Sequence, residues 1–138
     1  MHIDDDTPAV RSWHAHIYFD GAAQRALAAE LRERIAGRWA LQLGRWHDAP
    51  PGPHTRPMYM VAFAPALFDG VVPWLALNRR GLDILLHPNT LAPRADHLQH
   101  ALWLGQPQPL RAEVLAAAIS IDDDEALMIN TTPREGAR

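Results

Sequence analysis

The sequence predicts an α+β protein, because segments with the alternation of strands and segments with the spacing of helices follow each other along the chain. Their order is strand, helix, strand, strand, helix, strand, which is the split βαβ repeat of a ferredoxin-like fold. In that fold two helices cover one face of a four-stranded antiparallel sheet. The other face then needs a cover, either a partner subunit or the segment after residue 90, and we expect a homodimer. The strands are expected at 13–19, 38–47, 58–64 and 82–87, and the helices at 22–36 and 68–80.

The first strand carries the most informative pattern. Residues two apart in a strand point to the same face, so His14, His16 and Tyr18 are expected together on one face. The intervening residues, Ala15 and Ile17, then point into the opposite layer with Phe19. The sheet therefore has one apolar face and one face that carries imidazoles.

The helices and the connections follow from simpler signals. Ala23, Leu27, Leu31 and Ile35 keep a four-residue step that predicts an amphipathic first helix, which ends at Gly37. Residues 48–57 hold four prolines around His54 and form a rigid turn segment. The second helix tolerates Pro73 only in its first turn, and Pro88 ends the last strand.

The remaining segments complete the domain organisation. Residues 96–104 form a short helix or an extended arm, and residues 110–119 are expected to be helical. Residues 1–11 are a flexible leader, 12–119 a single domain and 120–138 a mobile tail.

Composition excludes several classes of function. The chain has 138 residues, no cysteine and a net charge of -3. Without cysteine, any metal must be held by nitrogen and oxygen ligands, and the charge argues against nucleic-acid binding. No apolar run is long enough to cross a membrane and no signal peptide is present, so a cytoplasmic location without membrane contact is expected. Phosphate-binding glycine loops, serine-hydrolase elbows and zinc-protease motifs are also missing.

The eight histidines are the chemical candidates. Neutral imidazole is the commonest metal ligand and also transfers protons near neutral pH. The predicted topology places His87 beside His14, so His14, His16 and His87 converge. A strand histidine is also explained as half-exposed or satisfied by a neighbour, and His87 as a strand-end residue whose ring satisfies loop backbone. His54 is expected at the opposite end of the first strand from His87. They would share one site only if the cavity runs lengthwise or a second subunit contributes.

Four further residues are weaker candidates. His97 and His100 share a face if their segment is helical, and they either cap the cavity or lie in solvent. Arg79 is most simply explained by the last turn of the second helix. Arg45 is a candidate for binding a substrate carboxylate.

These residues also form a familiar set. The set consists of Trp13-His14-Ala15-His16-Ile17-Tyr18-Phe19-Asp20, Gly44-Arg45-Trp46-His47, Pro51-Gly52-Pro53-His54, His87-Pro88, Asp96-His97 and Trp103-Leu104-Gly105. In unbroken order from about Trp13 to Gly105, these strings resemble the DOPA 4,5-dioxygenase family. The resemblance implies a ferredoxin-like fold and extradiol cleavage of a catechol such as L-DOPA with molecular oxygen. Fe(II) is the expected metal, and zinc is the alternative in the purified protein.

The resemblance also suggests roles for the candidates. An iron site of this type usually has two histidines and one carboxylate, but no carboxylate accompanies the histidines on their strands. A set of three histidines is therefore expected. His54 is either a fourth ligand or the acid or base of ring opening. Two other functions stay open: a metal enzyme of different chemistry, and a non-enzymatic dimeric module that binds a small ligand. The expected metal ligands are His14, His16 and His87; the catalytic residues are His54, His97 and Tyr18; and the substrate-binding residues are Arg45, Arg79 and His100.

Overall fold

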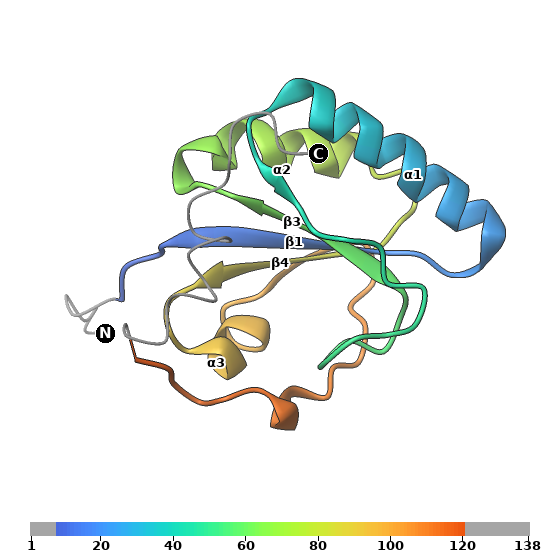
Figure 1. Ribbon diagram of the computed structural model, residues 1–138. Coiled ribbons are helices and arrows are strands. Elements are labelled where there is room, and N and C mark those ends of the chain that lie inside the picture. Colours follow the sequence, from blue (N-terminus) through green and yellow to red (C-terminus); the bar gives the residue numbers. More distant parts are fainter. Residues whose placement is uncertain (1–7, 121–138) are drawn as a thin grey trace.

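The computed structural model describes residues 8–120, and these form an α+β fold around one five-stranded antiparallel sheet. The sheet order is β2-β3-β1-β4-β5. Helices α1 and α2 lie on one side of the sheet, and α3 with the segment that follows lies on the other (Figure 1). The elements are β1 (Ser12–Tyr18), α1 (Gly21–Arg38), β2 (Gln42–Leu43), β3 (Met58–Phe63), η1 (Pro65–Leu67), α2 (Phe68–Asn78), β4 (Ile84–Asn89), α3 (Pro93–His97), β5 (Leu102–Leu104) and η2 (Ala112–Val114).

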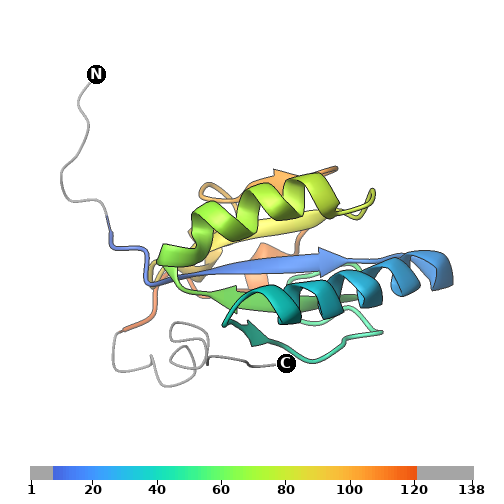
Figure 2. The ribbon, with the colours of Figure 1, turned by 90° about the horizontal axis from the view of Figure 1, so that it is seen from above.

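Strand β1 is central, as predicted, and pairs antiparallel with both β3 and β4. Its register places His14 directly opposite His87, which confirms that these two histidines are neighbours. The predicted count of four strands is wrong, because β5 pairs with β4 as a fifth strand at the edge of the sheet. Figure 2 shows α1 and α2 lying side by side over the sheet.

The strand predicted at 38–47 is largely wrong. Helix α1 continues past Gly37 to Arg38, so the strand loses its first residues, and only β2 forms a ladder with β3. Beyond β2, the Gly44 amide donates to the Met60 carbonyl and His47 forms an isolated bridge with Met58. The chain thus follows β3 loosely and is free to curve around the edge of the sheet with His54.

Two prolines also differ from expectation. Pro73 lies inside α2 rather than in its first turn, which the helix tolerates with one fewer backbone hydrogen bond. Pro88 does not end the last strand, because β4 runs through it to Asn89. Since β5 pairs with β4 only from Ile84 to Leu86, the missing N–H of Pro88 breaks no ladder on that side.

The main core lies between the sheet and helices α1 and α2. Ala15, Ile17 and Phe19 of the β1 segment point into it, which confirms the predicted alternation. From α1 the buried residues include Leu31 and Ile35, whereas Ala23, assigned to the apolar stripe, is exposed. The apolar face of the sheet is thus the helical side, and the histidines face the other way.

The histidine face is covered by the chain itself. Helix α3 packs on β4, and the segment that follows β5 runs across the same side of the sheet. The predicted helix at 110–119 is wrong: apart from the single turn of η2 this segment is irregular, and the Arg94 guanidinium binds it by donating to the Leu115 carbonyl. An uncovered sheet face therefore no longer supports a homodimer, which stays a prediction.

Two sequence predictions fall at the chain ends. Most of the expected leader and nearly all of the expected tail lie outside the described residues. Among the helices that the structure does describe, none combines the length and apolar character needed to cross a bilayer.

Candidate metal centre

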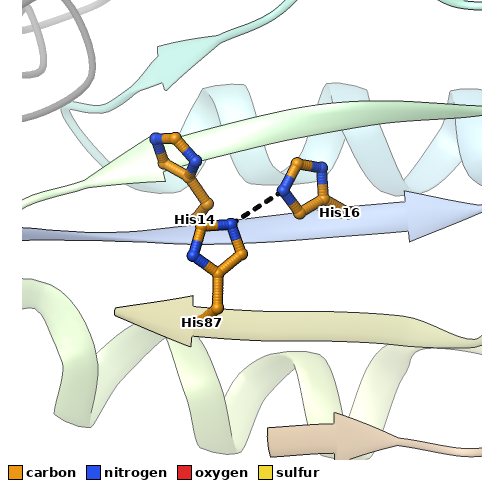
Figure 3. Close-up of side chains that lie close together, drawn as sticks. All are labelled: His14, His16 and His87. Atoms are coloured by element: carbon orange, nitrogen blue, oxygen red, sulfur yellow. Dashed lines mark hydrogen bonds between the residues drawn. The ribbon is translucent and has the colours of Figure 1, made fainter. Parts of the chain in front are cut away.

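Five histidines from four parts of the chain meet on the covered face of the sheet. Strand β1 contributes His14 and His16, β4 contributes His87, the β2–β3 connection contributes His54, and α3 contributes His97. Each is at most 9% exposed. Figure 3 shows His14, His16 and His87 projecting from their adjacent strands toward one another. Five imidazoles in one buried cluster are poor core material unless a ligand organises them.

His16 lies at the middle of this cluster. Its Nε2 atom is 3.0 Å from Nε2 of His87, and its ring centroid is 4.2 Å from that of His54. The His97 ring lies 3.9 Å from the His87 ring, and the His14 ring 4.9 Å from it. The cluster therefore runs lengthwise along β1 and includes both His54 and His87 from one chain, although these two belong to different groups of possible metal ligands.

The outer nitrogens of two rings are held by acceptors. Nδ1 of His87 lies 2.9 Å from the Pro88 carbonyl oxygen, and Nδ1 of His16 lies 3.2 Å from the Met58 sulfur. The Pro88 carbonyl only accepts, so Nδ1 of His87 carries the ring hydrogen and its Nε2 presents a lone pair; the Met58 sulfur, a weak acceptor, favours the same tautomer in His16. The two Nε2 atoms face each other at 3.0 Å, and in these tautomers both are free to bind one cation.

Geometry and the third ring fit a metal ion. Two imidazole nitrogens that bind one ion at about 2.1 Å and at a right angle lie about 3 Å apart. His14 adds a buried Nε2 atom that has no hydrogen-bond partner. A carbonyl that holds the far nitrogen of a histidine is the usual support for a metal ligand. The observed donor set therefore fits a metal ion.

Burial keeps these imidazoles uncharged. Desolvation, reinforced by neighbouring histidines, lowers the pKa of His14 to about 3 and that of His54 to about 4. The same causes hold the pKa values of His16 and His87 well below the ordinary value, and desolvation also lowers that of His97. At neutral pH all five rings are neutral, which is the form that binds metals.

Two overlapping groups in residues 8–120 have the spacing of a metal site: His14 with His16 and His87, and His16 with His54 and His97. Within each group the ligand atoms lie within 4.8 Å of one another. Neither group includes a carboxylate, as the sequence suggested. His16 belongs to both, so it is the residue on which either arrangement depends.

The buried carboxylate of Asp96 belongs to neither ligand group and instead accepts structural hydrogen bonds. It accepts hydrogen bonds from the Thr90 amide at 2.8 Å, from the Thr90 hydroxyl at 2.7 Å and from Nδ1 of His100 at 2.8 Å. These bonds tie α3 to the end of β4 across Leu91, whose φ is +71°. Asp96 therefore fixes the turn that brings His97 to His87. The i,i+4 spacing of Asp96 and His100 is the sequence signal for this pair.

Only part of the predicted set is brought together. Tyr18 joins the cluster through a 2.7 Å hydrogen bond between its hydroxyl and Nδ1 of His54. Burial raises the pKa of Tyr18. His100 lies outside both ligand groups with a half-exposed side chain. Arg45 is exposed, and Arg79 donates to the Leu82 carbonyl in the turn after α2, so the structure brings neither arginine to the histidines.

Sequence reasoning missed the apolar neighbours of the cluster. Met58 and Leu85 are buried beside Tyr18, with Trp103 and Leu110 packed against them. The Trp103 and Tyr18 rings are stacked with centroids 6.0 Å apart. Alternation along β3 and β4 is the signal for Met58 and Leu85, because it places them on the histidine face.

Fold and site together define a small α+β protein with a buried cluster of histidines able to hold a metal ion. The chain belongs to the Dopa 4,5-dioxygenase family, whose model matches residues 13–114, and the resemblance noted in the sequence is thereby confirmed.

Individual relatives agree with this assignment. The chain is 34% identical over 124 residues to a DOPA 4,5-dioxygenase of Amanita muscaria, covering 84% of this chain and 53% of that protein. It is 36% identical over 110 residues to an uncharacterized 21.2 kDa protein of Botryotinia fuckeliana, covering 72% of this chain and 60% of that protein. The chain thus spans little more than half the length of these two relatives.

A solved structure is also similar. A crystal structure from Nostoc punctiforme, described as a "putative dioxygenase", superposes with a TM-score of 0.73 at 55% sequence identity. The match covers 75% of this chain and 90% of that one.

Proposed function

We propose that this protein is an extradiol dioxygenase that opens the ring of a catechol such as L-DOPA by 4,5-cleavage, using O2 and a non-haem metal bound by histidines. The observation that carries the proposal is the 3.0 Å approach of the Nε2 atoms of His16 and His87, beside the unpartnered Nε2 of His14. Family membership supplies the reaction class.

His14, His16 and His87 would hold the metal, for which we propose Fe(II). When bound, Fe(II) at a site with open positions supplies the redox chemistry that lets O2 react with a catechol. The ring carbon–carbon bond beside the paired hydroxyls breaks, and both oxygen atoms enter the product. Catechol and O2 account for every atom of that product, so no further reductant is needed.

The protein surroundings suit an aromatic substrate. Met58, Leu85 and Trp103 form an apolar border next to the cluster and exclude water. The β2–β3 connection and the segment before η2 close over the histidines, joined by the Thr55 hydroxyl, which donates to the Pro109 carbonyl at 2.6 Å. Because the histidines are buried, this cover has to open for a catechol to enter.

Oxygen uptake by the iron-loaded protein tests the proposal. The full-length chain, loaded with Fe(II) under anaerobic conditions, should consume one O2 for each L-DOPA or simple catechol converted to a yellow ring-opened product. The His16→Ala variant should lose nearly all turnover. His47→Ala is the matched control, because His47 lies outside both ligand groups. No oxygen uptake across a panel of catechols, with iron shown to be bound, would refute the assignment.

The same experiment separates the alternatives. A protein that copurifies with zinc and stays inactive on catechols after iron loading would be a metal enzyme of other chemistry. A protein that binds no metal, and whose ligand binding survives His14→Ala, would be a binding module.

A further inference from the structure

The buried imidazoles differ in the hydrogen-bond partners of their Nδ1 atoms, and these partners determine which rings can donate or accept a proton through Nε2. For His87 and His97 the partners are the backbone carbonyls of Pro88 and Pro93, at 2.9 and 2.7 Å. A carbonyl oxygen only accepts hydrogen bonds, so Nδ1 of each ring carries the hydrogen. A neutral imidazole has one N–H, and Nε2 of each ring is therefore an acceptor.

His54 is the exception, because its Nδ1 partner is a hydroxyl. The Tyr18 hydroxyl lies 2.7 Å away and is buried, with Tyr18 only 1% exposed. Among residues 8–120 the structure gives this hydroxyl no other hydrogen-bond partner, so its hydrogen has one acceptor available, Nδ1 of His54. A hydroxyl that donates there leaves Nδ1 unprotonated and places the ring hydrogen of His54 on Nε2.

His54 also lies against the rest of the cluster. Its ring centroid is 4.2 Å from that of His16 and 6.0 Å from that of His97. The loop that carries it is fixed on both sides, since the Arg111 amide donates to the Pro53 carbonyl and the His54 amide donates to the Pro51 carbonyl. The protonated edge of His54 is therefore held beside rings that present acceptor nitrogens.

We propose that His54 is the hydrogen donor of the site rather than a metal ligand, that Tyr18 is the positioning residue which keeps the hydrogen on Nε2, and that His97 is the proton acceptor. The inference rests on the proposed function for its substrate, and it selects His14, His16 and His87 over the second ligand group. A neutral ring with hydrogen on Nε2 has no lone pair there to bind a metal.

The proton balance of the proposed reaction uses both rings. As a catechol O–H bond breaks, its proton forms an N–H bond at Nε2 of His97. As the ring opens, the Nε2–H bond of His54 breaks and its proton forms an O–H bond on the product. Since catechol plus O2 contains every hydrogen of the product, one proton then passes from His97 back to His54. The acid and base roles thereby belong to two separate histidines.

Tautomers read by NMR test the inference without turnover. In ¹⁵N-labelled full-length protein, metal-free and loaded with diamagnetic Zn²⁺, two-bond proton–nitrogen spectra show which ring nitrogen of each histidine is protonated. We expect hydrogen on Nε2 of His54 and on Nδ1 of His87 and His97. Zinc should shift the Nε2 signals of His14, His16 and His87 and produce no coordination shift at His54. Hydrogen on Nδ1 of His54, or a zinc-induced coordination shift at its Nε2, would overturn the proposal.

Variants of the two tyrosines supply the control. Tyr18→Phe should move the His54 hydrogen away from exclusive occupancy of Nε2 and lower kcat by about 10²-fold at unchanged metal content. Tyr59→Phe removes the other tyrosine hydroxyl, which donates to the Ala28 carbonyl in the helical core, and should leave the His54 pattern unchanged. An unaltered His54 tautomer in folded Tyr18→Phe also refutes the role of Tyr18.

The two proposals fail in different ways. If Tyr18→Phe does not fold, the wild-type tautomers and the zinc shifts still decide the inference. If no metal binds, the dioxygenase proposal fails, whereas the His54 tautomer of the metal-free protein remains measurable.

Discussion

Replacing His14 by leucine should stabilise the metal-free protein while it weakens the metal site. The Nε2 atom of His14 is buried without a hydrogen-bond partner, and such a group costs about 1–3 kcal/mol of folding free energy. Leucine has a similar volume and no polar atom. We therefore expect the metal-free His14→Leu variant to exceed the wild type in unfolding free energy by about 1–3 kcal/mol at pH 7.

The difference in unfolding free energy between the His14→Leu variant and the wild type should increase at acidic pH. Burial lowers the pKa of His14 from 6.5 to about 3 in the folded state. Above pH 6.5 the ring is neutral in both states and pH has no effect through it. Below pH 6.5 the unfolded chain binds a proton that the folded chain does not, so stability falls by about 1.4 kcal/mol for each pH unit until the folded ring is protonated. At pH 5 the His14 contribution is a loss of about 2 kcal/mol, which the leucine variant avoids.

Urea unfolding of both proteins in the presence of a chelator measures the effect. The difference between variant and wild type should grow by about 2 kcal/mol between pH 7 and pH 5, and should stay constant between pH 7 and pH 8, which is the internal control. Added zinc should stabilise the wild type far more than the variant. If the variant is less stable than the metal-free wild type at pH 7, or if the difference in unfolding free energy does not change between pH 7 and pH 5, the His14 ring is satisfied in the folded protein.

Three further predictions concern other positions. His16→Ala should reduce metal affinity by at least about 10²-fold in isothermal titration, because His16 belongs to both ligand groups; retained affinity would exclude both. Gly105→Ala should lower the melting temperature, because the φ of Gly105 is +85° and a Cβ atom there would lie 2.5 Å from the Asp83 carboxylate oxygen. In the control Gly37→Ala, the new Cβ atom meets nothing within 4 Å, so this variant should be neutral or stabilised by about 0.5–1 kcal/mol. Equal melting temperatures would contradict this. Asp96→Asn should destabilise the fold by about 2–4 kcal/mol in urea unfolding, since a buried carboxylate acceptor is lost, and an unchanged midpoint would remove its role in holding α3.

The sequence was most informative where local periodicity decides the outcome. Alternation along β1 placed His14 and His16 on one face and Ala15 and Ile17 on the other, and the structure confirms this. The order of elements also predicted that β1 lies between β3 and β4, which brought His87 to His14. Both results follow from the two-residue period of a strand and from antiparallel pairing, which the residues themselves encode.

The edges of the sheet were not predictable in the same way. The segment at 38–47 alternates, yet only Gln42 and Leu43 form a ladder, because α1 extends to Arg38 and the chain then curves away. The edge strand β5 has only three residues and its pattern is too short to distinguish from an arm. Pairing at an edge depends on which neighbour is in reach, and this is a tertiary property.

By itself, the sequence determined the histidine-bearing face, the absence of thiolate ligands and the three strand histidines of the centre. Only the tertiary structure decided that His54 and His97 join them, since a proline-rich loop and a short helix reach the cluster through contacts between residues distant in sequence. It also decided which group lies against the outer nitrogen of each ring. Whether an imidazole accepts or donates toward the cluster depends on its outer partner, a carbonyl for His97 and the Tyr18 hydroxyl for His54, and no pattern of residue types specifies that partner.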